Sequence, residues 1–143
     1  MPILAVFAIA IIAFAAAFHF RWAFGGRRGF EISLPQRPDG QPVLRHLLRL
    51  WRPAALLIAS GLVLLAGLVA AKALQLTHGI DPRLLELSLL ATGAAFIARA
   101  VVPNRYVGFF KRLRSTRWAR YDTWLYSPLF LTLGLLLVVI ARP

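Results

Sequence analysis

The chain has 143 residues, of which 59% are hydrophobic and only 15% are charged. Soluble domains are about 45–50% apolar and about 25% charged, so this composition excludes an ordinary soluble enzyme and a disordered tail. The sequence contains no cysteine, which excludes disulfide scaffolds, thiolate metal sites and cysteine nucleophiles. The formal net charge is +12, from 17 Lys and Arg against 5 Asp and Glu.

Four segments are long and apolar enough to cross a bilayer, which takes roughly 20 residues per helix. The sequence predicts spans at about residues 2–20, 53–74, 83–102 and 123–141. A cleaved signal peptide is the alternative for the first segment, but such peptides carry positive charge before the apolar stretch, and here Arg21 follows it. We therefore expect an all-α membrane protein, a four-transmembrane-helix bundle forming one domain over residues 1–143.

The segment before the second span is predicted to be an amphipathic helix in the membrane interface. Prolines and glycine over residues 31–42 indicate a loop. After it, leucines and Trp51 recur at helical spacing, a pattern typical of interfacial helices. The opposite face carries four basic or imidazole side chains, Arg45, His46, Arg49 and Arg52. The alternative is a frayed extension of the second span.

Positive charge is concentrated in two alternate connections. Seven arginines lie between Arg21 and Arg52, and seven Lys or Arg lie between Arg99 and Arg120. Because loops rich in Lys and Arg stay in the cytoplasm, we expect connections 21–52 and 103–122 to be cytoplasmic. Both termini and the connection near His78 would then face outward, as in a multi-pass protein of a bacterial inner membrane.

The basic connections also suggest partners. Anionic lipid head groups on the cytoplasmic face would attract them, at about 1 kcal/mol per Lys or Arg. Nucleic acid is the alternative, because aromatic and basic residues interleave over residues 106–121, as stacking platforms require. The same mixture is typical of an interfacial belt at a span's end, so we expect no nucleic-acid partner. A protein partner or a homo-oligomer stays open.

Polar residues at the cytoplasmic ends of the spans are the candidate site. Ionisable groups inside spans are functional candidates by default, and the middle of the predicted bundle has none, which argues against a proton-coupled carrier. The topology brings several span ends to one side of the membrane. We predict a ligand site formed by six residues: His19, Trp22, Arg99, Tyr106, Asp122 and Tyr126.

Two of these residues have structural and functional alternatives. Asp122 is the only acid in a region dense with arginine, and an ion pair with Arg99, Arg105 or Arg120 would join helix ends. It could instead contact a ligand or act as a base. His19 is either a hydrogen-bonded interface residue or a general base, with Arg99 as an anion anchor.

Metal and cofactor sites are not expected. The three histidines, His19, His46 and His78, lie in separate predicted elements, and no helical metal-binding pattern is present. The sequence also lacks a Walker A motif, a GxSxG motif and a dinucleotide fingerprint. Gly25, Gly26 and Gly29 lack the preceding strand that a phosphate-binding loop needs.

Two stretches resemble recurring segments of a family of small bacterial four-span membrane proteins known only as a domain of unknown function. One is RYVGFFKRLRSTRWARYDTWLYSPL, from Arg105 to Leu129, and the other is HFRWAFGG, from His19 to Gly26. The resemblance covers essentially the whole chain. It implies a four-span architecture without an established activity. It also implies that eight positions matter: Tyr106, Gly108, Phe109, Lys111, Arg117, Asp122, Tyr126 and Pro128.

These observations favour a non-catalytic membrane module that binds a lipid-like or small apolar ligand, or a protein partner, at its cytoplasmic end. Two alternatives stay open. One is a membrane enzyme acting on a lipid head group, and the other is an accessory subunit of a larger membrane complex.

Overall fold

The computed structural model describes residues 2–76 and 79–142. The elements named in these residues are all helices, which confirms the all-α prediction. They are α1 (Pro2–Ala23), the 3-10 helix η1 (Arg45–Leu50), α2 (Trp51–Ala73), α3 (Pro82–Val101), α4 (Arg117–Tyr121), the π-helix η2 (Asp122–Tyr126) and α5 (Ser127–Ala141). His78, which was expected on the outward face, lies outside the described residues.

Four helices are long and apolar enough to cross a membrane: Pro2–Ala23, Arg45–Ala73, Pro82–Val101 and Arg117–Ala141. The fourth begins before Thr123, where the span was expected to start. Its first turn is capped by Thr116, whose hydroxyl accepts a hydrogen bond from the Ala119 amide at 3.1 Å, so the amphipathic segment before the apolar run is helical as well. Similarly, the side chain of Asp81 caps α3.

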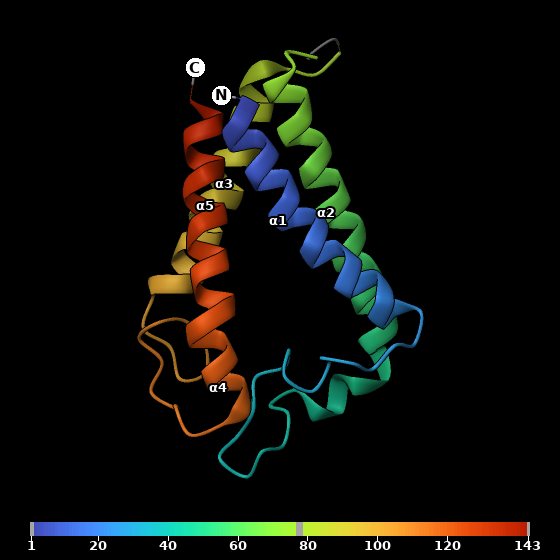
Figure 1. Ribbon diagram of the computed structural model, residues 1–143, viewed down its shortest axis with the longest axis vertical. Helices are drawn as coiled ribbons and strands as arrows, with labels where there is room; N and C mark the ends of the chain where they lie inside the picture. The colour runs from blue at the N-terminus through green and yellow to red at the C-terminus, as the bar shows by residue number, and fades with distance from the viewer. Residues whose placement is uncertain (1, 77–78, 143) are drawn as a thin grey trace.

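The helices form two pairs (Figure 1). Helix α1 packs along α2, and α3 packs along α5. The α3–α5 contact is close because two glycines face each other. A Cβ atom on Gly93 would lie 2.8 Å from the carbonyl oxygen of Gly134, and the reverse distance is also 2.8 Å. Small residues permit such close approach of membrane helices. Gly61 and Gly67 of α2 are exposed, and a Cβ atom on either would meet nothing within 4 Å.

The two pairs meet at the end that carries both chain termini and diverge toward the other end (Figure 1). The core lies where they meet. It includes Ala8 and Ile12 of α1, Val69 of α2, Leu89 of α3 and Leu137 of α5, all fully buried. An ion pair between Lys72 and Glu86, 2.6 Å long, joins α2 to α3.

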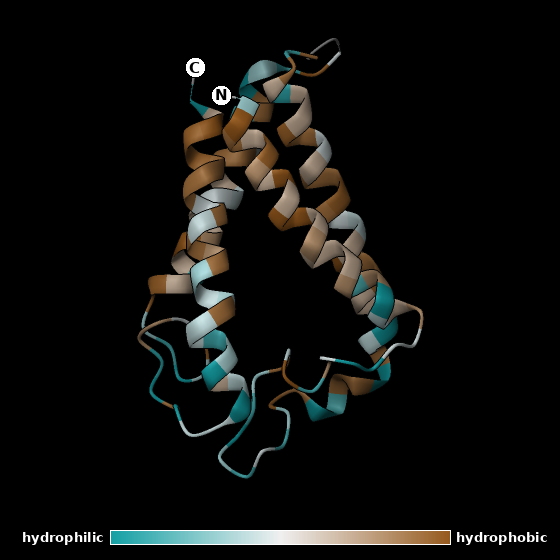
Figure 2. Ribbon diagram, in the orientation of Figure 1, coloured by the Kyte–Doolittle hydropathy of each residue, from teal (hydrophilic) through white to brown (hydrophobic). Residues whose placement is uncertain are grey.

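The diverging end carries the two arginine-rich connections (Figures 1 and 2). The predicted amphipathic helix is a 3-10 helix over Arg45–Leu50 that leads directly into α2. Its apolar side chains are not covered by protein: Leu44, Leu47 and Leu50 are about half exposed.

Much of the helix surface away from the core is also apolar (Figure 2). Ile3, Leu57 and Leu64 are each at least 65% exposed. Monomeric soluble proteins rarely expose large contiguous apolar patches, so a hydrocarbon environment suits this surface. The fold is that of a multi-pass membrane protein.

Candidate functional site

The fourth span contains a π turn that sets the position of Asp122. The Ser127 amide donates to the Asp122 carbonyl, five residues earlier, in place of the usual four. Pro128 follows immediately and has no amide hydrogen to donate. The helix therefore passes through Pro128 without a break. Single π turns often occur at functional sites.

The carboxylate of Asp122 is fully buried and accepts four hydrogen bonds. Its Oδ1 accepts from Nη2 of Arg99 at 2.5 Å. Its Oδ2 accepts from the Gly108 amide at 2.9 Å, Nζ of Lys111 at 3.0 Å and the Ser127 hydroxyl at 3.2 Å. Of the three arginines that sequence reasoning offered as partners, Arg99 is the one that pairs. Both carboxylate oxygens accept hydrogen bonds from protein groups, so Asp122 joins α3, the third connection and the fourth span.

Lys111 is the second partner, and sequence reasoning from charge did not find it. Only 2% of Lys111 is exposed. Its ammonium group donates to the Gly108 carbonyl at 2.9 Å and the Thr123 hydroxyl at 2.7 Å, as well as to Asp122. All three ammonium hydrogens therefore have acceptors. The family resemblance was the only signal that pointed to this lysine.

Gly108 brings the third connection onto the helix ends. It has a φ of +85°, which favours glycine. A Cβ atom there would lie 2.8 Å from the carbonyl oxygen of Ala100. The next amide, of Phe109, donates to that same carbonyl at 2.8 Å. The loop is thus fastened to the end of α3 as well as to the buried ion cluster of Arg99, Lys111 and Asp122.

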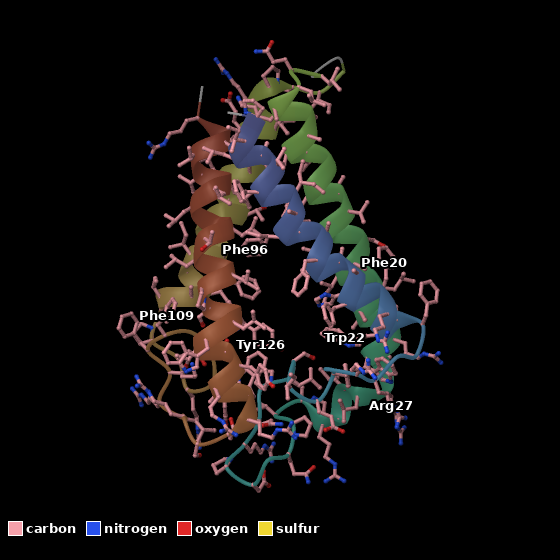
Figure 3. All side chains as sticks on the ribbon, viewed as in Figure 1. Phe20, Trp22, Arg27, Phe96, Phe109 and Tyr126 are labelled. Atoms are coloured by element: carbon pink, nitrogen blue, oxygen red, sulfur yellow. The ribbon has the colours of Figure 1, made fainter. Side chains whose placement is uncertain are left out.

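A second, apolar feature lies between the two helix pairs. It is a cavity of about 650 Å³, within the size range of small-molecule sites. Its walls come from α1, α2, α3, the fourth span and, at Gly29 and Ile32, the first connection. Most lining side chains are aliphatic or aromatic. Phe96 and Tyr126 point into the space between the pairs from one side, and Trp22 lies across from them (Figure 3).

Few polar groups line the cavity. His19 and Trp22 lie side by side on α1, with ring centroids 5.0 Å apart. Nδ1 of His19 lies 2.8 Å from the carbonyl oxygen of Ala15, so it carries the proton. The indole of Trp22 donates to the Arg28 carbonyl at 3.1 Å. Tyr126 stacks on Trp118 with centroids 5.2 Å apart.

The first connection links the two helix pairs at the diverging end. Near α1 it is held by the bond from Trp22 to Arg28 and by the ring of Phe30, which packs between Trp22 and Trp51. Further along, the side chain of Gln36 accepts a hydrogen bond from the Trp118 amide at 3.2 Å. This amide lies in the first turn of α4 and has no partner within its own helix. Residues 27–42 therefore form a strap between the pairs.

The six predicted site residues fall into three groups. His19, Trp22 and Tyr126 line the cavity. Arg99 and Asp122 form the buried ion cluster, which touches the cavity wall through Phe130, because the guanidinium carbon of Arg99 lies 4.4 Å from the centroid of that ring. Tyr106 lies in neither group. Its carbonyl accepts from the indole of Trp118 at 2.8 Å.

Charge and hydropathy patterns did not point to Gln36, Lys111 or the cavity, and only the family resemblance indicated Lys111. A glutamine in a proline-rich loop carries no signal that it will cap a helix 82 residues away. In residues 2–76 and 79–142, no group of three or more His, Cys, Asp or Glu side chains could hold a metal ion.

The helices and the lipid-facing surface define a four-span, multi-pass α-helical membrane protein. The chain belongs to the family described as a protein of unknown function (DUF3995), which matches residues 11–137. This match confirms the family resemblance inferred from the two sequence stretches. No curated protein and no solved structure matches the chain significantly.

Proposed function

We propose that this protein is a non-catalytic module of a bacterial inner membrane that binds a lipid-like ligand in the cavity between its helix pairs. The observation that carries the proposal is the apolar cavity of about 650 Å³, with His19, Trp22 and Tyr126 among its lining residues. Binding sites of this size are typically apolar with a few polar groups that fix orientation. The ligand would sit at the cytoplasmic end of the bundle.

The orientation rests on the arginine-rich connections. They lie at the diverging end, and the positive-inside rule assigns that end to the cytoplasm. The chain termini then face outward. Anionic head groups of the inner leaflet would surround the same connections.

The strap favours access from the membrane. Residues 27–42 are hydrogen-bonded to both helix pairs at the basic end. A ligand arriving from water would have to displace them, whereas a lipid could move sideways between the diverging pairs. A non-catalytic role fits the hydrogen bonding of Asp122, whose two oxygens accept four hydrogen bonds from protein groups and are therefore not free to act as a base.

Native mass spectrometry after mild detergent extraction tests the proposal. The wild-type protein should retain a small apolar molecule. Gly61→Phe should abolish retention, because Gly61 lines the cavity and a side chain there meets nothing within 4 Å. Gly67→Phe is the matched control: this glycine lies on the same helix with equal space but does not line the cavity. Equal retention by all three proteins would refute the proposal.

A further inference from the structure

We infer that the ligand is an uncharged lipid alcohol whose hydroxyl end lies beside His19 and Tyr126. This inference rests on the proposed function and names the chemical class of its ligand. It follows from three properties of the cavity: the charge of its walls, the hydrogen-bonding groups left free there, and their place at one end.

The walls carry no charged side chain. Among the described residues that line the cavity there is no Asp, Glu, Lys or Arg. The guanidinium of Arg99 lies over one lining residue, Phe130, and its charge is paired with Asp122. Placing a phosphate or carboxylate against such walls would strip its water without supplying a counter-charge, which is strongly unfavourable. The cavity therefore suits a neutral molecule.

Most of the polar atoms lining the cavity are already occupied. Nδ1 of His19, the indole nitrogen of Trp22 and the hydroxyl of Thr92 each donate to a backbone carbonyl, at 2.8, 3.1 and 2.8 Å. Two side-chain groups have no hydrogen-bond partner within the described part of the chain: Nε2 of His19 and the hydroxyl of Tyr126. These two groups can bind a ligand without giving up an internal hydrogen bond; the Thr92 hydroxyl, which already donates, can still accept.

The two free groups differ in what they require. Because Nδ1 of His19 carries the proton, neutral His19 presents a lone pair at Nε2, which needs a hydrogen-bond donor. The Tyr126 hydroxyl both donates and accepts. A hydroxyl head group satisfies each of them. A ketone, ester or ether accepts only and leaves the His19 lone pair unfilled, and leaving such a group unpaired reduces affinity.

The two free groups, on His19 and Tyr126, both lie toward one end of the cavity. His19 is in the last two turns of α1, and Tyr126 is the last residue of the π turn, so both lie toward the diverging end. The lining toward the closed end is mostly apolar and includes Leu65 and Leu133, and its Thr92 hydroxyl already donates to the Ser88 carbonyl. The hydroxyl would thus point toward the arginine-rich connections and the hydrocarbon chain toward the core.

Three probes with the same hydrocarbon chain test which head group the cavity prefers: hexadecanol, its methyl ether and hexadecyl phosphate. The full-length protein in non-ionic detergent micelles would be equilibrated with each, and retention measured by native mass spectrometry. We expect hexadecanol to be retained about fivefold more than the ether, the equivalent of one hydrogen bond, and hexadecyl phosphate to be the weakest. Equal or stronger retention of the phosphate overturns the inference.

Variants that remove the free groups of His19 and Tyr126 provide a second test. His19→Leu should lower hexadecanol retention toward the level of the ether and leave ether retention unchanged, because the ether has no proton to donate to Nε2. Tyr126→Phe should lower the retention of both, because the Tyr126 hydroxyl can donate to either oxygen. Tyr121→Phe and His46→Leu are matched controls, since neither residue lines the cavity. If Tyr126→Phe and His19→Leu, still folded by circular dichroism, bind hexadecanol like the wild type, the inference is wrong although the cavity still binds lipid.

Other occupants give distinct outcomes. If a phospholipid co-purifies and binds Tyr126→Phe and His19→Leu as well as it binds the wild type, the lipid-alcohol inference is wrong but the proposed function stands. A mass of two chains with no probe bound indicates that a second copy fills the space, and both proposals then fail. Failure of all three probes to bind wild-type monomer, with no co-purified molecule, also rejects the proposed function itself.

Discussion

The ammonium group of Lys111 lies 3.0 Å from the carboxylate of Asp122, and both side chains are closed off from solvent. Lys111 comes from a loop, whereas Asp122 lies in the fourth span. Since Arg99 of α3 pairs with the other oxygen of the same carboxylate, one acid joins three separate segments. Removing different members of this cluster should therefore have unequal effects.

Asp122→Asn should destabilise the protein more than Lys111→Met does. The first change leaves two cations facing each other without a counter-charge, and breaking a buried pair in this way costs about 3–5 kcal/mol. The second leaves Asp122 neutralised by Arg99 and removes hydrogen bonds worth about 1–3 kcal/mol. Unfolding by sodium dodecyl sulfate in mixed micelles, followed by tryptophan fluorescence, measures both. A larger loss for Lys111→Met would contradict the assigned pairing.

Gly93→Ala should weaken the α3–α5 pair, while Gly67→Ala should not. Both changes favour a helix by about 1 kcal/mol. At Gly93 the new Cβ meets the Gly134 carbonyl at 2.8 Å, whereas at Gly67 it meets nothing within 4 Å. Overpacking costs about 1–3 kcal/mol, so Gly93→Ala should lower the unfolding free energy and Gly67→Ala should raise it. The same unfolding assay compares them, and a gain for both variants would rule out a tight glycine contact.

Gln36→Ala should loosen the strap. The Trp118 amide loses its acceptor, so its hydrogen exchange should accelerate roughly fivefold, the equivalent of about 1 kcal/mol. Gln41→Ala, in the same exposed connection, is the control, because Gln41 is bonded there through its backbone amide and carbonyl, which the substitution keeps. Exchange followed by mass spectrometry resolves the peptide around Trp118. Identical rates in the two variants would show that the strap is held by other contacts.

The proposed orientation can be tested by cysteine labelling, because the natural sequence has no cysteine. Leu76→Cys, in the connection between α2 and α3, should react with a membrane-impermeant thiol reagent in intact cells. Arg37→Cys and Arg112→Cys, in the two basic connections, should react only after permeabilisation. All three positions are exposed. The reverse pattern would mean that the arginine-rich end faces outward.

The four spans could be predicted from the sequence because each apolar run is long enough to cross the hydrocarbon core of a bilayer. The first three helices differ from the predicted bounds by at most three residues. The fourth differs more, since Thr116 starts its helix within a polar stretch that hydropathy cannot separate from a loop. Hydrogen-bonded caps of this kind depend on backbone geometry that composition does not reveal.

The site was only partly accessible to sequence reasoning. Asp122 could be singled out from the sequence because it is the only acid in an arginine-rich region. Which of Arg99, Arg105 and Arg120 pairs with it depends on how the π turn orients the carboxylate. Burial of Lys111 depends on the left-handed turn at Gly108. The cavity depends on which helix faces pair and how far the pairs diverge, and no one-dimensional pattern contains that information.

The π turn has a consequence for the length of the chain. It places one residue more within a hydrogen-bonded ring than the α-helix on either side. Deleting a single residue between Asp122 and Ser127 would restore a regular α-helix and leave the segments on either side nearly in register. Deleting one from the α-helical part of α5 would instead rotate the residues on either side of it by about 100° relative to each other. The spacing of Asp122 and Tyr126, and not only their identity, therefore sets where the buried ion cluster lies relative to the cavity.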